Sequence, residues 1–172
     1  MFLSHGNSVF HQDIGSWDVS NGTIFDSMFE GATEFNQDIG DWDISNATDL
    51  GEMFAEATSF NQDIGGWDLG SVRDTSSMLR GATSFNHDIT NWDVSSVKDF
   101  VAMFAFTSFN QDISSWDVSS GTDYAYMFLG ATSFNQDIRN WDVSNGESFY
   151  GMFSFATDFD QDLRYWEVDS VD

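Results

Sequence analysis

The chain has 172 residues, of which 41 % are apolar, and it contains neither cysteine nor proline. This length suits one domain with a core, and the lack of cysteine excludes disulfides and thiolate metal sites. The 29 acidic residues against five lysines and arginines give a formal net charge of −24. That charge excludes nucleic acid as a partner and disfavours anionic membranes, whereas cations and basic partners remain. An acidic surface can also serve solubility alone.

A repeat of about 25 residues runs through the whole chain. A phenylalanine opens each unit at intervals of 25, 25, 25, 24, 25 and 25 residues, and a tryptophan follows seven residues after each. The tryptophans are Trp17, Trp42, Trp67, Trp92, Trp116, Trp141 and Trp166. The short interval falls in the fourth unit, which lacks an alanine, and we expect a local distortion around Phe106. The array predicts a single solenoid over residues 1–172 with about seven coils. Because both ends fall inside a unit, we expect a segment of a longer array.

Each unit predicts two short elements in chain order. The first is a parallel strand around the tryptophan, in which Trp67 and Leu69 face inward and Asp68 faces outward. The second is a helical turn over 50–57, where apolar residues recur at i, i+3, i+4 and i+7. Asp49 precedes this stripe and resembles the first residue of a capping box. These elements predict a leucine-rich-repeat-like coil, with the seven tryptophans forming one inward row.

The repeated strings carry a family resemblance. "FNQDI-x-x-WDVS" followed by "MF-x-x-ATSF" occurs in nearly every unit and resembles the repeat of BspA-like leucine-rich-repeat surface proteins. The resemblance implies a right-handed solenoid, a secreted or surface-anchored protein, and a role in adhesion or binding without an assigned catalytic site. An extracellular or cell-surface location rests on this resemblance, because the chain shows no signal or anchor motif.

Two rows of carboxylates follow the repeat. For the row after the tryptophans we expect few local donors, so bound cations would relieve the repulsion between neighbouring coils. The predicted metal ligands are Asp43, Asp68, Asp93, Asp117 and Asp142. Calcium is the natural ion, since oxygen ligands are plentiful and histidine or cysteine clusters are absent; a solvated, salt-screened face is the alternative. In the second row, within "NQDI", Asx turns are expected instead. The asparagine before it predicts a ladder of side-chain amides.

These features predict a protein that is not an enzyme, because an active site requires unlike groups that converge at one place. The predicted function is a noncatalytic surface or secreted module for adhesion or for protein or glycan binding, with calcium assisting. The alternative is a structural protein that self-assembles into a filament or wall layer. Expected partners exclude nucleic acid and direct membrane insertion, and they include end-to-end or lateral self-association. Exposed aromatic residues would favour a glycan ligand.

Overall fold

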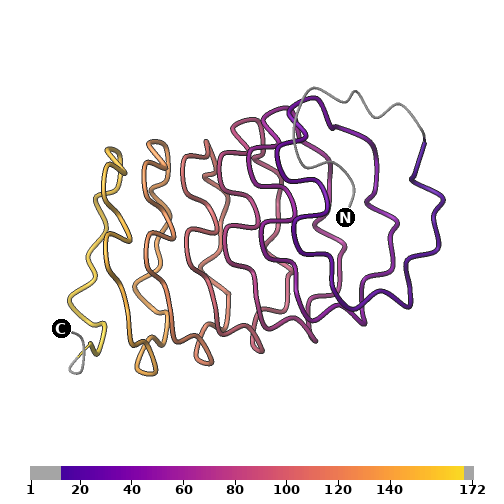
Figure 1. The fold of residues 1–172 in the computed structure, drawn as a ribbon. Coiled ribbons are helices and arrows are strands. Elements are labelled where there is room, and N and C mark those ends of the chain that lie inside the picture. Colours follow the sequence, from indigo (N-terminus) through magenta and orange to yellow (C-terminus); the bar gives the residue numbers. More distant parts are fainter. Residues whose placement is uncertain (1–12, 169–172) are drawn as a thin grey trace.

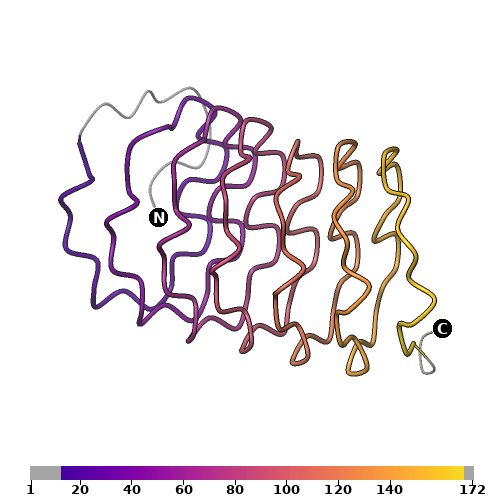
Figure 2. The ribbon, with the colours of Figure 1, turned by 180° about the vertical axis from the view of Figure 1, so that it is seen from behind.

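A computed structural model gives the structure of the protein and describes residues 13–168. The repeat units form coils that lie side by side in one stack, from the indigo end to the yellow end (Figure 1), and the view from behind shows the same order (Figure 2). Each coil has two halves, which we call the tryptophan segment and the ladder segment. The tryptophan segments are 14–19, 39–44, 64–69, 89–94, 113–118, 138–143 and 163–168. The ladder segments are 25–31, 50–56, 75–81, 100–106, 124–130 and 149–155.

Regular secondary structure is almost absent from these coils. Between residues 13 and 168 the backbone forms no helix, and its β-structure consists of isolated parallel bridges. The bridges join, in order, Ile24, Asp49, Asp74, Asp99, Asp123 and Ser148. The predicted leucine-rich-repeat-like solenoid is therefore wrong, because it requires a strand and a helical turn in every coil. The bridges also lie in the ladder half, away from the tryptophans where the strand was expected.

Backbone hydrogen bonds between ladder segments all run in one direction. In the first segment, the N–H groups of Phe25, Ser27 and Phe29 donate to carbonyls of the next coil, with N···O distances of 2.8–2.9 Å. The intervening N–H groups turn back into their own coil, as where Met28 donates to the carbonyl of Phe25 at 3.2 Å. Within these segments each coil therefore offers N–H groups to its successor. Just before them the direction reverses, as where the N–H of Thr48 donates to the carbonyl of Thr23 at 2.8 Å.

Two positions of positive φ in every ladder segment explain why no helix forms. The first position holds Ser27, Glu52, Ser77, Ala102, Tyr126 and Gly151, and the second holds Gly31, Glu56, Gly81, Phe106, Gly130 and Phe155, with φ between 52° and 70°. A left-handed residue interrupts the run of right-handed φ and ψ values that an α-helix needs, so the N–H groups bond to the next coil instead. The predicted helix cap at Asp49 is wrong for the same reason. Its carboxylate accepts the N–H of Gly51 at 2.9 Å, in an Asx turn.

The inward-facing columns are nevertheless confirmed. The apolar stripe of 50–57 is fully buried, and Asp68 is exposed between the buried Trp67 and Leu69. In place of a strand, a turn closes this segment, where the N–H of Trp67 donates to the carbonyl of Ile64 at 3.1 Å. Five tryptophans are buried, Trp42, Trp67, Trp92, Trp116 and Trp141. The inward row is thus confirmed for its middle, whereas Trp17 is 38 % exposed.

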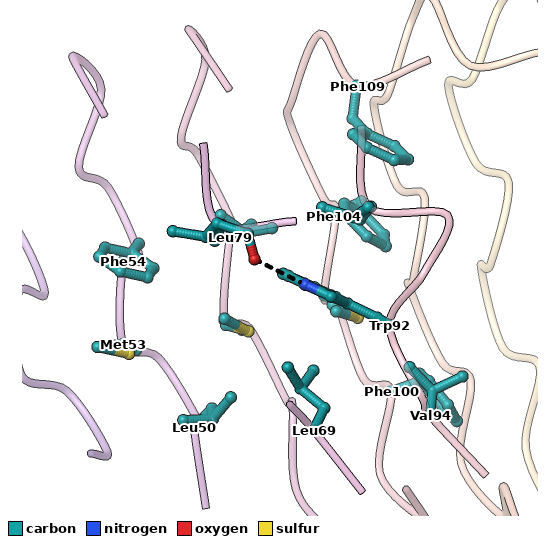
Figure 3. Packing of buried hydrophobic residues seen from close by; sticks show 14 of the residues in the cluster. Leu50, Met53, Phe54, Leu69, Leu79, Trp92, Val94, Phe100, Phe104 and Phe109 are labelled. Atoms are coloured by element: carbon teal, nitrogen blue, oxygen red, sulfur yellow. Dashed lines mark hydrogen bonds between the residues drawn. The ribbon is translucent and has the colours of Figure 1, made fainter. Parts of the chain in front are cut away.

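The indole N–H groups couple each coil to the one before it. Trp92 Nε1 donates to the carbonyl of Ile64 at 2.9 Å, and the ring lies among the buried side chains shown in Figure 3. Equivalent bonds of 3.0–3.2 Å are made by Trp42, Trp67, Trp116, Trp141 and Trp166. The rings of Trp92 and Trp116 are stacked with centroids 6.2 Å apart. A buried polar atom is satisfied in this way at every step of the stack.

The asparagine column forms the predicted amide ladder. The side-chain oxygen of Asn36 accepts the backbone N–H of Asn61 at 2.9 Å, and that of Asn110 accepts the N–H of Asn135 at 3.0 Å. Gln62 adds a bond from its amide nitrogen to the Asn36 carbonyl at 3.0 Å. These side chains replace the missing backbone ladder in the tryptophan half of the coil.

The fourth unit accommodates its missing residue after Phe106. Phe106 keeps the left-handed conformation of its column, with φ of 58°. Thr107 takes the buried place of the absent alanine, and its hydroxyl donates to the carbonyl of Phe104 at 2.7 Å. The turn bond that Phe60 makes to Ala57 in the second unit has no counterpart at Phe109 among residues 13–168. The predicted distortion therefore lies in the following turn and leaves Phe106 in register.

Candidate functional site

The five aspartates predicted to hold a cation lie on the exposed side of the tryptophan segments, where local donors satisfy them. Each accepts the backbone N–H of the residue two positions later at 2.9–3.1 Å. Four of them also accept a serine hydroxyl at 2.6–2.7 Å, namely Asp43, Asp93, Asp117 and Asp142. Asp68 lacks this second bond because Gly70 stands in place of the serine. The expectation of few local donors is wrong for this row.

These bonds stabilise the ionised carboxylates. The serine hydroxyl, followed by the backbone N–H, holds the pKa of Asp43, Asp93 and Asp142 below the usual value of an aspartate. Within residues 13–168, no three acidic, histidine or cysteine side chains gather in a way that could hold a metal ion. The calcium prediction for the five aspartates thus rests on the sequence alone and stays a prediction.

The second acidic row adopts the predicted Asx turns. Asp63 accepts the N–H of Gly65 at 3.0 Å, and the same bond recurs in the other coils. Two members also carry ion pairs. Arg139 lies 2.9 Å from Asp137, and Arg164 lies 2.8 Å from Asp162. The two arginines nearest the C-terminal end are therefore each neutralised by their own coil.

A third acidic row lies in the bridges of the ladder. Burial raises the pKa of Asp99, opposed by the N–H of Val101, and the charges of Asp74 and Asp123 raise it further. Each of these carboxylates accepts one backbone N–H at 2.8–2.9 Å. This row is half-buried and holds the turn, so it is structural in character.

Four exposed rings lie on the last three ladder segments, and we call them the aromatic patch. They are Phe106, Tyr126, Tyr150 and Phe155, with 50, 36, 71 and 79 % of their surface exposed. Tyr126 and Tyr150 meet edge to face with centroids 5.3 Å apart. Clustered exposed apolar surface marks interaction sites in soluble proteins, and here the two tyrosines are in direct contact.

The patch departs from the repeat at positions that normally hold small or polar residues. Phe106 and Phe155 occupy the column that elsewhere holds Gly31, Gly81 and Gly130. Phe106, Phe155 and Tyr126 all have positive φ, which is rare for bulky residues and costs about 1–2 kcal/mol each. These rings gain partial burial at most, least of all Phe155, so the strain makes these side chains candidates for function.

Glycines in adjacent coils leave room for two of the rings. A Cβ placed on Gly130 would lie 2.6 Å from the ring of Phe106, and one placed on Gly151 would lie 2.8 Å from the ring of Tyr126. Each ring therefore leans over the bare backbone of the following coil. Phe106 therefore covers the backbone of Gly130.

In the second and third coils the same columns carry charge. Glu56 lies over Gly81 and pairs with Arg80 at 2.6 Å. The outer side of the ladder thus changes from charged to aromatic along the stack. Comparing the columns of the sequence would have found the patch, since Phe106 and Phe155 stand where the repeat has glycine.

These features define a repeat protein built from turns, with a surface that differs between its two halves. The family described as "Mycoplasma protein of unknown function, DUF285" matches over residues 1–108 and 84–172, and the chain belongs to this family. No curated protein and no solved structure matches the chain. No helix that could span a bilayer occurs between residues 13 and 168.

Proposed function

We propose that this chain is a noncatalytic binding module of a secreted or cell-surface protein and that it binds its ligand through the aromatic patch. The observation that carries the proposal is the strained, exposed set Phe106, Tyr126 and Phe155, which breaks the repeat. A stack of equivalent coils needs no such residues for its core, since the rings that hold it together are buried. Residues that break a repeat against their own conformational preference are best explained by a ligand.

The arrangement of the acids supports a noncatalytic role. The carboxylates after the tryptophans have nearly the same donors in every coil, and so do those of the Asx turns. Catalysis by paired carboxylates requires unlike environments that separate an acid from a base. The surface location is carried by the resemblance to BspA-like proteins, and labelling of intact cells with a membrane-impermeant reagent would test it.

The binding role is tested by comparing two variants across a ligand screen. Immobilised chain is exposed to a glycan array and to a peptide library, and bound ligands are measured again with Tyr150→Ala/Phe155→Ala. Tyr165→Ala is the matched control, because Tyr165 is 70 % exposed but belongs to a tryptophan segment. We expect to find ligands that still bind the Tyr165→Ala control but no longer bind the double variant. Ligands that respond equally to both variants would contradict a binding role for the patch.

Structural assembly is the second candidate, and one observation favours it. The N–H groups of Phe149, Gly151, Phe153 and Phe155 occupy the donor positions of the ladder, but they have no acceptor among residues 13–168. A cavity of about 490 Å³, lined by Phe153, Trp166 and other residues, lies at the same end. A further coil of this repeat would supply the carbonyls and cover the apolar side chains. Light scattering over a range of concentrations tests this role, and a constant monomer mass would exclude it.

A further inference from the structure

We infer that the partner of the aromatic patch is a basic peptide segment, whose lysine and arginine side chains lie against the exposed rings. This inference rests on the proposed function, since it names the chemistry of the ligand for the same site. Two observations carry it: the charges around the patch and the faces that the rings present.

Exposed carboxylates flank in sequence the ladder segment that holds two of the rings, and no lysine or arginine lies beside this segment. Glu147 and Asp158 are exposed on either side of the ladder segment 149–155, which holds two of the rings. No lysine or arginine occurs between Lys98 and Arg139, nor between Arg139 and Arg164. The two arginines are paired with Asp137 and Asp162, as described above. Lys98 precedes the segment of Phe106, at the repeat position that Glu147 holds two coils later. The charge complementarity to a cationic ligand therefore centres on Tyr150 and Phe155.

The rings themselves suit a cation. The face of an aromatic ring attracts an ammonium or guanidinium group within about 6 Å of its centroid. Tyr150 and Phe155 are the most exposed of the four rings and lie on the same ladder segment. A basic side chain over either face has a carboxylate close by in sequence, at Glu147 or at Asp158. Rings supply contact area, and the carboxylates supply charge complementarity.

Other ligand classes fit less well. A net charge of −24 repels acidic peptides, nucleic acids and sulfated or carboxylated glycans. Neutral sugars need polar groups that converge on their hydroxyls in addition to a ring. Two of the four rings of the patch are phenylalanines, which offer a sugar no polar group. The observations therefore favour a basic peptide over a neutral glycan.

The test measures binding of the whole chain to one defined probe. The probe is a synthetic peptide in which lysine and arginine alternate with glycine and serine, and its neutral counterpart carries acetyl-lysine and citrulline at the same positions. Isothermal titration calorimetry is done with the parent chain, with Tyr150→Ala/Phe155→Ala, and with Glu147→Gln/Asp158→Asn. A matched variant, Asp18→Asn/Asp43→Asn, removes the same number of charges from the tryptophan segments.

We expect the parent to bind the basic peptide and to ignore the neutral one, with affinity that falls as salt rises. Loss of the two rings should weaken binding by about tenfold or more. Neutralising Glu147 and Asp158 should weaken it more than neutralising Asp18 and Asp43. Circular dichroism melting of each variant shows that the fold is retained, because the altered side chains are exposed.

Three results would overturn the inference, and they separate it from the proposed function. Equal binding by the parent and by Tyr150→Ala/Phe155→Ala would mean that the peptide is attracted by overall charge. Capture of a neutral oligosaccharide that depends on the same rings, without peptide binding, would refute the basic partner and leave the binding module intact. A patch that contributes to the binding of neither probe nor any array ligand would refute both.

Discussion

The replacement of Trp92 tests the link that holds each coil to its predecessor. Its indole is 3 % exposed, donates to the carbonyl of Ile64 at 2.9 Å and stacks on Trp116. Trp92→Phe keeps an aromatic ring but removes the N–H donor. The same carbonyl also accepts the N–H of Trp67 at 3.1 Å, so the variant leaves one of its two bonds in place.

The expected loss has two parts. A buried hydrogen bond to a carbonyl that keeps another partner contributes about 1 kcal/mol. The smaller ring leaves a cavity, and its cost is about 1–2 kcal/mol when the neighbours relax only in part. Trp92→Phe should therefore lower the free energy of unfolding by about 2–3 kcal/mol, and Trp92→Ala by about 3–5 kcal/mol.

Urea unfolding followed by circular dichroism measures these losses. Tyr150→Ala is the control, because its ring is 71 % exposed, and it should change stability by no more than about 0.5 kcal/mol. If Trp92→Phe were as stable as this control, the indole hydrogen bond would contribute nothing to stability. A loss in Trp92→Phe equal to that in Trp92→Ala would also refute the division into bond and cavity.

Three further predictions concern the backbone and the acids. Ala102→Gly should stabilise the chain by about 0.5–1 kcal/mol, because φ at Ala102 is 52° and glycine adopts this conformation without strain. Ala105→Gly, at a residue with negative φ, should destabilise the chain by at least as much. If urea unfolding gave stability changes of the same sign for both variants, the left-handed conformation of Ala102 would be contradicted. Four serines donate hydroxyl hydrogen bonds to aspartates whose pKa is thereby lowered, and replacing these serines by alanine should reduce the melting temperature at pH values above the ordinary carboxyl pKa of 3.8. The difference from the parent should vanish as the pH falls through the lowered pKa values of the folded state, because the bonds stabilise only the ionised carboxylates. These serines are Ser20, Ser45, Ser95 and Ser144, and a difference that persists at about pH 2 would exclude this origin. If calcium binds the acidic row, the melting temperature should rise more in millimolar calcium than in sodium at equal ionic strength. The variant Asp68→Asn/Asp93→Asn should lose this additional rise. Equal melting temperatures in the two salts would show that the row is a solvated acidic face.

Burial could be predicted from the sequence, but conformation could not. The spacing of Leu50, Met53 and Phe54 marks one buried stripe, and that stripe is buried. The same spacing serves a helix and a series of three-residue turns, because both bring i, i+3 and i+4 to one side. The choice between them is made by hydrogen bonds to the next coil, about 24 residues away.

The left-handed positions show where the local signal runs out. Glycine at 31, 81 and 130 indicates a positive φ, as glycine does in many turns. Glu52 and Ala102 also have a positive φ, although neither residue type prefers this conformation, so the sequence does not indicate it. The aromatic patch was missed for a related reason: Phe106 and Phe155 look like core residues in a chain rich in phenylalanine, and only their column reveals that they replace glycine.

The shared direction of the hydrogen bonds within the ladder segments gives this part of the stack an electric polarity. Peptide units with their N–H groups toward one end add their dipoles, each about 3.5 D, along the axis. The ladder segment 149–155 thus directs partial positive charge outward along the axis, and the ladder segment 25–31 directs partial negative charge the other way. Two copies of the same ladder edge do not match well, since their ladder segments would both offer donors or both acceptors. Any association through the ladder segments is therefore expected to be head to tail.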